Sequence, residues 1–596
     1  MSYLFALSLF LAPALGALYT NPSQLPGKSN YDYIVVGGGA GGGVIANRLT
    51  EDIGTRVLLI EAGSSDYQNL NIRVPGFASR LGGSQFDWNF TTAAQPGLNG
   101  RTIPYTRGHV LGGSTSINYM AYTRGSKDDW DRWANVTGDD GWSWDSVQPY
   151  VRKMEKLVPP ADHHNTTGEI DPSIHGHYGP VGVSLAGYAL PTDPRVINAS
   201  LELSAEFPFN LDANSGNTLG ISWFQFTIAD GERVNSATAY IAPALRRSNL
   251  DVLVNTQVTK VLRTGTQSGK AVFRGVQLAQ NASSRVYTLN AHEEVVLSAG
   301  AIMTPHILLL SGVGDASLLS SLGIETIVDL PDVGQNLQDH PLVSSSYTVN
   351  STNTLDNLTA NATLLAEQLQ QWESTRTGEL VIGPSNQVGW LRLPGNSSIF
   401  ESAADPSAGP TSAHYQLFFS DSFISFSEPP PPGGHFLTVF TNLISPSTRG
   451  NVTLASKDPF EYPVIQPNFF STDFDIFTIR ESIKAARRYL SAPAWNDWIL
   501  EEFGSFAQAQ TDAEIEQYAR NSAFTVFHMC GTSAMGRTGS VGRGSGALNA
   551  DLTVKGTVGL RVVDASAFPF IPSGHTQVPV YILAERAADL IKHAHA

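Results

Sequence analysis

One stretch near the N-terminus, residues 33–63, constrains the fold more than any other part of the chain. It runs from an apolar segment through six glycines at positions 37–43 to a helix-compatible segment, and then to a second apolar run. This order predicts a strand, a tight turn, a helix and a second strand, the unit that binds a dinucleotide at the N-terminus of its helix. The chain is therefore expected to have an α/β fold with a Rossmann-like domain.

Three glycines and one acid in this stretch have the spacing of a dinucleotide-binding fingerprint: Gly37, Gly39, Gly42 and Glu61. Gly37 is predicted to make the tight turn, Gly39 to let the backbone approach a pyrophosphate, and Gly42 to let the helix pack closely on the strand. Glu61 ends the second strand, where a carboxylate accepts hydrogen bonds from an adenosine ribose. A flexible loop is the alternative, but the flanking strand, helix and acid favour the nucleotide site.

Length and charge limit the classes of protein that fit. A chain of 596 residues exceeds a single hydrophobic core, so about two domains are expected. The chain has 53 Asp and Glu residues against 37 Lys and Arg residues, and it has no basic run that would follow a phosphate backbone. We therefore expect no nucleic acid partner.

The segment 1–17 is apolar, too short to span a bilayer, and ends in small residues. We predict that this segment is a secretory signal peptide, with a buried strand or helix as the alternative. Ten N-x-S/T sequons agree with a glycosylating pathway, and no later segment reaches transmembrane length. The protein is therefore expected to be secreted, extracellular and not bound to a membrane. The sequons are at Asn89, Asn135, Asn165, Asn198, Asn281, Asn350, Asn357, Asn361, Asn396 and Asn451.

The domain organisation is expected to be discontinuous. Strand-like segments recur far from the first unit, at 251–263, 274–279 and 293–298, and residues 346–519 change to Thr-, Ser- and Asn-rich segments with aromatic strands. We predict a cofactor-binding domain built from residues 30–178, 236–345 and 521–596, and an α+β substrate-binding domain built from residues 179–235 and 346–520.

The C-terminal part holds two histidines in polar, glycine-containing blocks. His528 precedes a glycine-rich turn, and His575 precedes a segment that begins with Pro579 in its first turn and has the apolar spacing of an amphipathic helix. Taken singly, either histidine is more often structural than catalytic. Cys530, the single cysteine, excludes an intramolecular disulfide and is interpreted as a small packing residue.

Together these blocks resemble the glucose-methanol-choline (GMC) oxidoreductases over the whole chain after the leader. The resemblance rests on the glycine turn, the passage 107–125, the segment 298–314, the stretch 334–341 and the two histidine blocks, all in the family's order. Within the family, residues 128–133, Tyr119 and the Phe527-His528 pair look most like the fungal aryl-alcohol oxidases. The resemblance implies the two-domain GMC fold.

The resemblance also implies one FAD per chain, and the absence of a second glycine finger agrees with a flavoprotein that does not use NAD(P)H. Gly37, Gly39, Gly42 and Glu61 would hold the ADP half, with Val258 near the adenine. Some relatives attach the flavin to a histidine in the 107–125 passage; because Asn118 is an asparagine and His109 lies elsewhere, we expect noncovalent FAD. The flavin side is expected to be lined by Arg107, Gly112, Gly113, Asn118, Asp564, Ala565, Thr576, Gln577 and Val578.

Oxidation of an alcohol to an aldehyde needs a base for the hydroxyl proton and an acceptor for the hydride. By resemblance, His528 would be the base and His575 would hydrogen-bond the developing alkoxide. Molecular oxygen would then reoxidise the flavin and give hydrogen peroxide. Asp339 and His340 are expected to be structural.

The substrate is expected to be a primary alcohol, aromatic or benzylic, in an aromatic pocket formed by Tyr119, Phe423, Phe426 and Phe527. The two loop phenylalanines fit an ordinary core equally well. The alternatives are a sugar or alcohol dehydrogenase that uses quinone acceptors, a GMC-type hydroxynitrile lyase, and a secreted glycoprotein that binds without turnover. We expect a monomer and no metal site.

Overall fold

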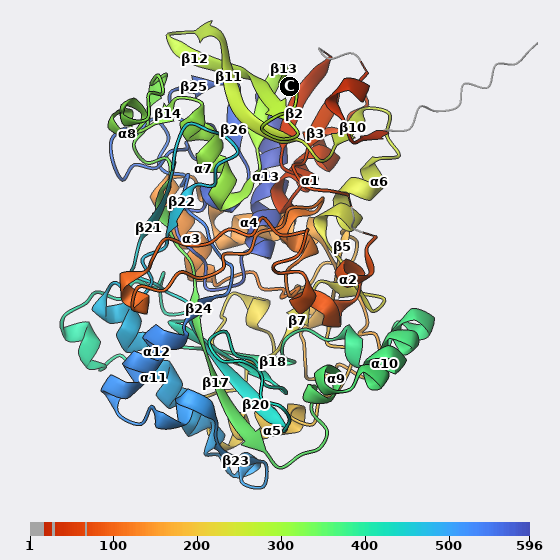
Figure 1. Cartoon of the computed structure of the whole chain (residues 1–596), viewed down its shortest axis with the longest axis vertical. Helices are drawn as coiled ribbons and strands as arrows, with labels where there is room; N and C mark the ends of the chain where they lie inside the picture. Colours follow the sequence, from red (N-terminus) through yellow and green to blue (C-terminus); the bar gives the residue numbers. More distant parts are fainter. Residues whose placement is uncertain (1–16, 27–29, 66–67, 596) are drawn as a thin grey trace, which may run out of the picture.

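The computed structural model describes residues 17–26, 30–65 and 68–595, so the predicted signal peptide lies outside the described residues except for Ala17. Figure 1 shows two parts stacked along the long axis, with a mostly parallel sheet in the upper part and an antiparallel sheet in the lower part. Segments from both ends of the sequence meet in the upper part, as a discontinuous domain requires.

The upper sheet is built from β1 (Ala17–Tyr19), β2 (Tyr31–Val36), β3 (Val57–Ile60), β10 (Leu250–Leu253), β11 (Gln257–Gln267), β12 (Lys270–Ala279), β13 (Tyr287–Leu297), β25 (Thr557–Val558) and β26 (Leu560–Val562). Its order is β1-β10-β3-β2-β13-β12-β11, with β26 paired to β13 and β25 to β12. The neighbouring strands β1, β10, β3, β2 and β13 run parallel, and β26 runs parallel to β13. Strands β11 and β12 form an antiparallel hairpin. The central strands β2 and β3 are buried along their length, except for the half-buried Asp32 in β2.

The helices of this part are α1 (Ala40–Leu49), α3 (Lys127–Thr137), α4 (Trp144–Met154), α7 (Gly300–Leu310) and α13 (Gln577–Ala594). The first and last of these, α1 and α13, pack side by side although they come from opposite ends of the sequence (Figure 1). Pro579 lies in the first turn of α13, so the predicted C-terminal helix is confirmed.

The lower sheet contains β6 (Gly220–Trp223), β17 (Pro341–Val349), β18 (Gln387–Leu391), β19 (Tyr415–Ser420), β20 (Phe436–Leu443), β23 (Ile499–Glu502) and β24 (Phe524–Thr525). Its order is β23-β17-β20-β19-β18-β6, with β24 paired to β17, and every pairing is antiparallel. One face packs against α11 (Asp473–Leu490), where the Phe419 and Tyr489 rings lie 5.1 Å apart. Alternate side chains therefore point to the opposite face, toward the upper part.

Smaller elements complete the chain. Further helices are α2 (Leu70–Arg73), α5 (Asp193–Glu202), α6 (Ala242–Ala244), α8 (Ala316–Ser321), α9 (Asp356–Ala360), α10 (Ala362–Thr375) and α12 (Asp512–Ser522). Short strands are β4 (Glu155–Leu157), β5 (Val181–Leu185), β7 (Gln225–Phe226), β8 (Ile228–Ala229), β9 (Glu232–Arg233), β14 (Val313–Gly314), β15 (Val328–Asp329), β16 (Gln335–Leu337), β21 (Gly450–Thr453) and β22 (Val464–Gln466).

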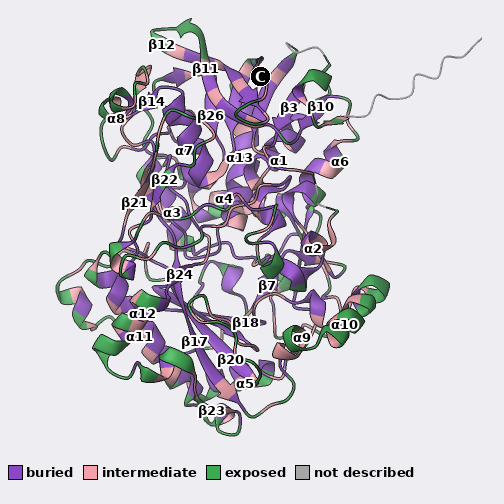
Figure 2. Cartoon of the chain, in the orientation of Figure 1, coloured by how far each residue is buried: buried purple, intermediate pink, exposed green. Residues whose placement is uncertain are grey.

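Each large sheet has its own hydrophobic core, and Figure 2 shows the central strands of both sheets buried, whereas α10 is largely exposed. The α/β fold with a second α+β part is therefore confirmed. The predicted boundary at residue 345 falls within β17, and β24 pairs with the lower sheet although the sequence places residues 521–596 in the cofactor domain. The chain crosses between the two parts along these strands, so a composition change does not mark the crossing.

Within residues 17–26, 30–65 and 68–595, no helix combines the length and apolar character needed to cross a membrane. The same residues contain no group of three or more His, Cys, Asp or Glu side chains arranged to hold a metal ion.

Candidate active site

The glycine turn after β2 has the geometry of a nucleotide-binding turn. Gly37 has a φ of +101°, and a Cβ there would lie 2.4 Å from the Ser298 carbonyl oxygen. A Cβ on Gly42 would lie 1.9 Å from the Gly37 carbonyl oxygen, so α1 sits directly on the turn. Gly39 caps α1, and a Cβ there would have only Gly113 within 4 Å. The N-terminus of α1 therefore faces open space, where its N–H groups and partial positive charge favour an anion.

Glu61 follows β3 at the same end of the sheet. Its carboxylate accepts hydrogen bonds from the amides of Gly38 at 2.7 Å and Gly63 at 2.8 Å, and burial raises the pKa of Glu61 to about 7. Glu61 and Val258 line one end of a cavity that also contains Gly37 and Gly39. The carboxylate thus fixes the turn as well as facing the predicted ribose position.

The second glycine passage contacts the first. Gly112 and Gly113 both have positive φ, and a Cβ on Gly113 would lie 2.8 Å from the Cα of Gly39. The Gly112 amide donates to the Gly38 carbonyl at 2.9 Å. Gly113 lines the cavity, whereas Gly112 shapes the turn and is absent from the cavity lining, so a contact of Gly112 with the cofactor stays a prediction.

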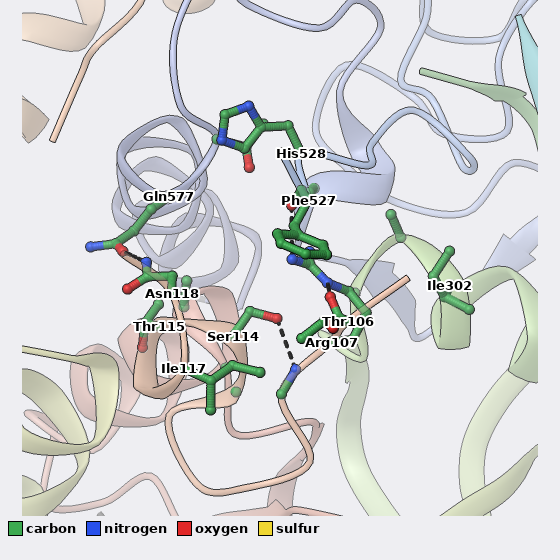
Figure 3. Close-up of a pocket in the computed structure, with 18 of the residues that line it drawn as sticks. Thr106, Arg107, Ser114, Thr115, Ile117, Asn118, Ile302, Phe527, His528 and Gln577 are labelled. Carbon is green, nitrogen blue, oxygen red and sulfur yellow. Dashed lines mark hydrogen bonds between the residues drawn. The ribbon is translucent and has the colours of Figure 1, made fainter. Parts of the chain in front are cut away.

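Arg107 and Asn118 connect this passage to the C-terminal blocks (Figure 3). Arg107 Nη2 donates to the Phe527 carbonyl at 2.8 Å, and Asn118 Nδ2 donates to Gln577 Oε1. Asn118 Oδ1 in turn accepts from Arg233 Nη1 at 2.8 Å. Residues that line the cavity but come from distant parts of the sequence are thereby held together in pairs.

The segment around Asp564 closes the cavity from the C-terminal side. Its carboxylate accepts from the Gly300 amide at 2.9 Å and from Thr304 Oγ1 at 2.6 Å, and burial raises the pKa of Asp564. Asp564, Ala565, Thr576 and Gln577 line the cavity, so the N-terminus of α13 opens onto it. Val578 does not line it, because its side chain lies in the hydrophobic core, so a contact of Val578 with the cofactor stays a prediction.

His528 and His575 meet in the same cavity that Glu61 lines. Their ring centroids are 4.8 Å apart, and the ring planes are 77° apart. Burial lowers the pKa of His575 to about 3, and burial, with smaller effects of His575, His340 and Arg107, lowers the pKa of His528 well below its ordinary value. Both imidazoles are therefore neutral near pH 7 and have a lone pair available for a proton.

His340 is a site residue that the sequence interpretation placed in a purely structural role. Its Nδ1 lies 2.9 Å from His528 Nδ1, and it is fully buried. Asp339 Oδ1 accepts from the backbone amides of both His340 and His528 at 2.8 Å. The sequence feature that could have indicated this role is the polar pair at 339–340, directly before the proline that starts β17.

Three of the four predicted aromatic residues line the cavity beside the histidines: Tyr119, Phe426 and Phe527. Phe426 stacks on Phe524, with centroids 4.3 Å apart and planes 2° apart. Phe423 lies outside the cavity because its ring packs against Phe436 and Phe503. The sequence did not reveal that Phe418 and Phe440, stacked 4.5 Å apart on β19 and β20, also line the cavity.

Two residues near the site take no direct part in it. His109 packs against Trp88, with centroids 4.3 Å apart, and is absent from the cavity lining. Cys530 is fully buried, and burial raises the pKa of its thiol well above the ordinary value, which makes it an unreactive packing residue.

These residues fit an extended FAD molecule. One continuous cavity joins the α1 N-terminus, Glu61 and Val258 to the two histidines. At Gly39 any side chain would project into the space that a pyrophosphate needs, and the N-termini of α1 and α13 both open onto the cavity.

Comparison with known proteins agrees with this geometry. Two family models, both described as GMC oxidoreductase, match residues 31–342 and 446–584. Dehydrogenase eriK of Hericium erinaceus is 41% identical over 97% of this chain and 96% of its own length. Pyranose dehydrogenase 3 of Leucoagaricus meleagris is 39% identical over 97% of this chain and 95% of its own length.

Solved structures show the same fold. An FAD-dependent oxidoreductase from Chaetomium thermophilum matches with a TM-score of 0.84 and 31% identity, covering 95% of this chain and all of that one. A fungal aryl-alcohol oxidase matches with a TM-score of 0.80 and 25% identity, covering 95% of this chain and 99% of that one. The chain therefore belongs to the GMC oxidoreductase family and uses FAD to oxidise a CH–OH group.

Proposed function

We propose that this enzyme oxidises a CH–OH group of a pyranose-type sugar and passes the electrons to a quinone-type acceptor. This is the sugar dehydrogenase alternative of the sequence interpretation. Several relatives that match nearly the whole chain are named pyranose dehydrogenases. The structural observation that supports a polyhydroxylated substrate is a row of three buried polar side chains, each with one polar atom that no described residue satisfies, and one of them, Trp390, lies beside His575.

This row crosses the lower sheet. Trp390, Gln416 and Asn442 lie opposite one another on β18, β19 and β20. Among the described residues, Trp390 Nε1, Gln416 Nε2 and Asn442 Oδ1 are buried and have no hydrogen-bond partner. Asn442 Nδ2 donates to Gln416 Oε1. Because the two amides share one hydrogen bond, the pair offers one spare donor and one spare acceptor in either orientation of the amides.

The row lies on the sheet face that borders the cavity, although Trp390, Gln416 and Asn442 are themselves absent from the cavity lining. Phe418 and Phe440, two residues along the same strands and hence on the same face, line the cavity. The Trp390 ring also lies 5.7 Å from the His575 ring. Buried polar groups favour a ligand that satisfies them, and sugar hydroxyls both donate and accept.

The chain's own groups account for the proton chemistry. The alcohol proton passes to His528 at Nε2, because Nδ1 is engaged by His340. His575 lies beside the same point and orients the oxygen. Bound FAD supplies the acceptor for the hydride. The N-terminus of α13 contributes a partial positive charge at the cavity wall.

A second candidate, an aromatic primary alcohol oxidase that releases hydrogen peroxide, is favoured by the aromatic lining. Tyr119, Phe426 and Phe527 offer ring faces for a benzylic substrate, and a fungal aryl-alcohol oxidase shares the fold. The two candidates differ in substrate and in electron acceptor, so one experiment separates them.

The experiment measures anaerobic bleaching of the FAD absorbance with pyranoses, benzylic alcohols and aliphatic alcohols, followed by reoxidation with a benzoquinone or with oxygen. Fast bleaching by a pyranose and faster reoxidation by the quinone are expected. Bleaching by benzyl alcohol with stoichiometric peroxide would favour the second candidate. No bleaching by any alcohol would contradict both and leave the lyase and the non-catalytic binding protein as alternatives.

Gln416→Leu tests the polar row directly. Loss of a buried hydrogen-bond partner costs about 1–3 kcal/mol, or roughly 5- to 150-fold in kcat/KM for a sugar. The kcat/KM for benzyl alcohol should change little, because that substrate lacks the extra hydroxyls. Phe426→Leu is the matched control and should affect the aromatic substrate more. An equal loss for both substrates in Gln416→Leu would contradict the assignment.

We also propose that the protein is a secreted glycoprotein that binds FAD noncovalently. Eight of the ten sequon asparagines are exposed, and the other two, Asn357 and Asn451, are half-buried. Culture medium should contain a protein whose mass falls on endoglycosidase treatment, and acid precipitation should leave the yellow chromophore in solution. Intracellular retention, or a yellow precipitate, would contradict the respective part.

A further inference from the structure

His340 lies directly behind His528, on the side away from the cavity. Their Nδ1 atoms are 2.9 Å apart, and the ring planes are 84° apart. His528 lines the cavity, whereas His340 does not. We propose that His340 is a positioning residue that fixes the ring orientation and tautomer of His528, leaving the Nε2 lone pair free for the alcohol proton. This inference rests on the proposed alcohol oxidation.

The backbone around the two histidines is held from both sides. Gln338 and Cys530 exchange two backbone hydrogen bonds of 3.0 and 2.9 Å, and the Val526 amide donates to the His340 carbonyl at 3.1 Å. The carboxylate of Asp339 accepts from both histidine amides. The Cα atoms of His340 and His528 are therefore fixed relative to each other, and the backbone holds the two rings in contact.

A hydrogen bond between two Nδ1 atoms requires one proton and one lone pair. If His528 carries the proton, its Nε2 is unprotonated and can act as a base. If His340 carries it, neutral His528 is protonated at Nε2 and cannot accept the alcohol proton. The position of the shared proton therefore decides whether His528 can act as the base.

The surroundings of His340 favour the first arrangement. Burial lowers the pKa of His340, and the Ile444 carbonyl opposes this in part, because a carbonyl oxygen favours a ring N–H. Since Nδ1 faces His528, the carbonyl favours the proton at Nε2, although no described residue forms a hydrogen bond with Nε2. His340 then presents the Nδ1 lone pair to the N–H of His528.

His340 stays neutral throughout. Burial is the main cause that lowers the pKa of His340, to about 3, and the neighbouring His575 lowers it further. The charged or titratable groups that face the pair are His575, Arg107 and Asp339. When the substrate O–H bond breaks, its proton forms the Nε2–H bond of His528. Bound FAD would accept the carbinol hydride with both of its electrons. The proton at His528 Nδ1 stays in place, shared with His340.

A matched pair of variants of the holoenzyme tests this role. His340→Asn keeps an acceptor, the amide oxygen, near the position of Nδ1, whereas His340→Leu has a similar size and no acceptor. Loss of a partner that orients a histidine costs about 10- to 100-fold. The anaerobic rate of flavin reduction should fall by that factor in His340→Leu and largely recover in His340→Asn. The apparent substrate Kd should stay within about twofold in both, which corresponds to about 0.4 kcal/mol.

His306→Leu is the control for loss of a buried histidine, since His306 is buried and absent from the cavity lining. It should leave the reduction rate unchanged. Equal rates in His340→Leu and the wild-type enzyme would overturn the proposal, as would equal losses in the Leu and Asn variants with normal FAD spectra.

Neutron diffraction of the wild-type holoenzyme locates the shared proton without any substitution. A deuteron on His528 Nδ1 is expected, and one on His340 Nδ1 with His528 Nδ1 bare would overturn the proposal. This measurement needs no substrate, so failure of every alcohol to reduce the flavin would count against the proposed function and not against the role of His340.

Discussion

Asp421, directly after β19, is a buried carboxyl whose two oxygens have no hydrogen-bond partner among the described residues. Burial, with smaller contributions from Asp356 and Asp193, raises its pKa to about 8. The group lies outside the cavity lining. At the residue scale Asp421 thus differs from His528 and His575, which line the cavity: it lies away from the cavity and is stabilised by keeping its own proton.

Substitution of Asp421 should change how stability depends on pH. The native pKa of about 8 lies above the unfolded value of about 3.9, so the folded state binds the proton more tightly. The contribution of this group to stability is full below about pH 4 and is lost as pH rises through 8. Asp421→Asn should therefore flatten the fall in melting temperature between pH 5 and 9.

The control is Asp145→Asn, which removes an exposed carboxylate at α4. Its melting temperature should follow the wild-type curve over the same range. An Asp421→Asn protein with the wild-type pH dependence would show that Asp421 is not the titrating group.

At the scale of elements, the junction of β2 and α1 determines whether the cofactor can bind. Gly42 lets the first turn of α1 rest on the Gly37 carbonyl, and Gly39 leaves the helix N-terminus open. The second passage fits against the same turn through Gly113. The turn at Gly37, the start of α1 and the passage at Gly113 therefore approach so closely that no side chain fits between their backbones.

Gly42→Ala should weaken both the fold and FAD binding. Its Cβ would lie 1.9 Å from backbone, which cannot move as a flexible side chain can. Overpacking of this kind costs about 1–3 kcal/mol, and the displaced helix would misalign the amides that face the pyrophosphate. Purified Gly42→Ala should show a lower ratio of flavin to protein absorbance and a lower melting temperature.

Gly265→Ala is the matched control, because a Cβ there has no atom within 4 Å and the residue has no positive φ. It should match the wild-type enzyme in both measurements. Normal FAD content in Gly42→Ala would contradict the role given to this glycine.

At the scale of the whole molecule, the cavity is where the two cores face each other. Its lining comes from both ends of the chain and from both sheets: the α1 turn, α7 and α13 above, and Phe418 and Phe440 below. A ligand that fills this cavity contacts segments of both the upper and the lower part and so adds contacts between the two parts. FAD should therefore stabilise the assembly of the two parts.

Apoenzyme prepared under mild conditions should gain stability with FAD concentration. Binding to the folded state alone adds about 2.7 kcal/mol at a hundred times the Kd. Riboflavin lacks the ADP half that the α1 turn and Glu61 are built to hold, so it should raise the melting temperature far less at equal concentration. Equal shifts for riboflavin and FAD would contradict the assignment of the ADP half to this turn.

Local patterns in the sequence were sufficient for the α/β class, the nucleotide turn and the C-terminal helix. Gly37, Gly42 and Pro579 act through their own backbone conformation and immediate neighbours, so their roles can be read from spacing. The resemblance added the family and the cofactor, which the comparisons support. It also added the catalytic roles of the two histidine blocks, which stay predictions.

Only the tertiary structure decided which side chains face the cavity. Phe423 and Phe426 are close in sequence and equally aromatic, yet one packs on Phe436 and the other lines the site. His340 and the row at 390, 416 and 442 gain their importance from contacts across strands and loops distant in sequence. Sequence spacing fixes a local backbone shape, whereas the direction of a side chain depends on register and packing between distant segments.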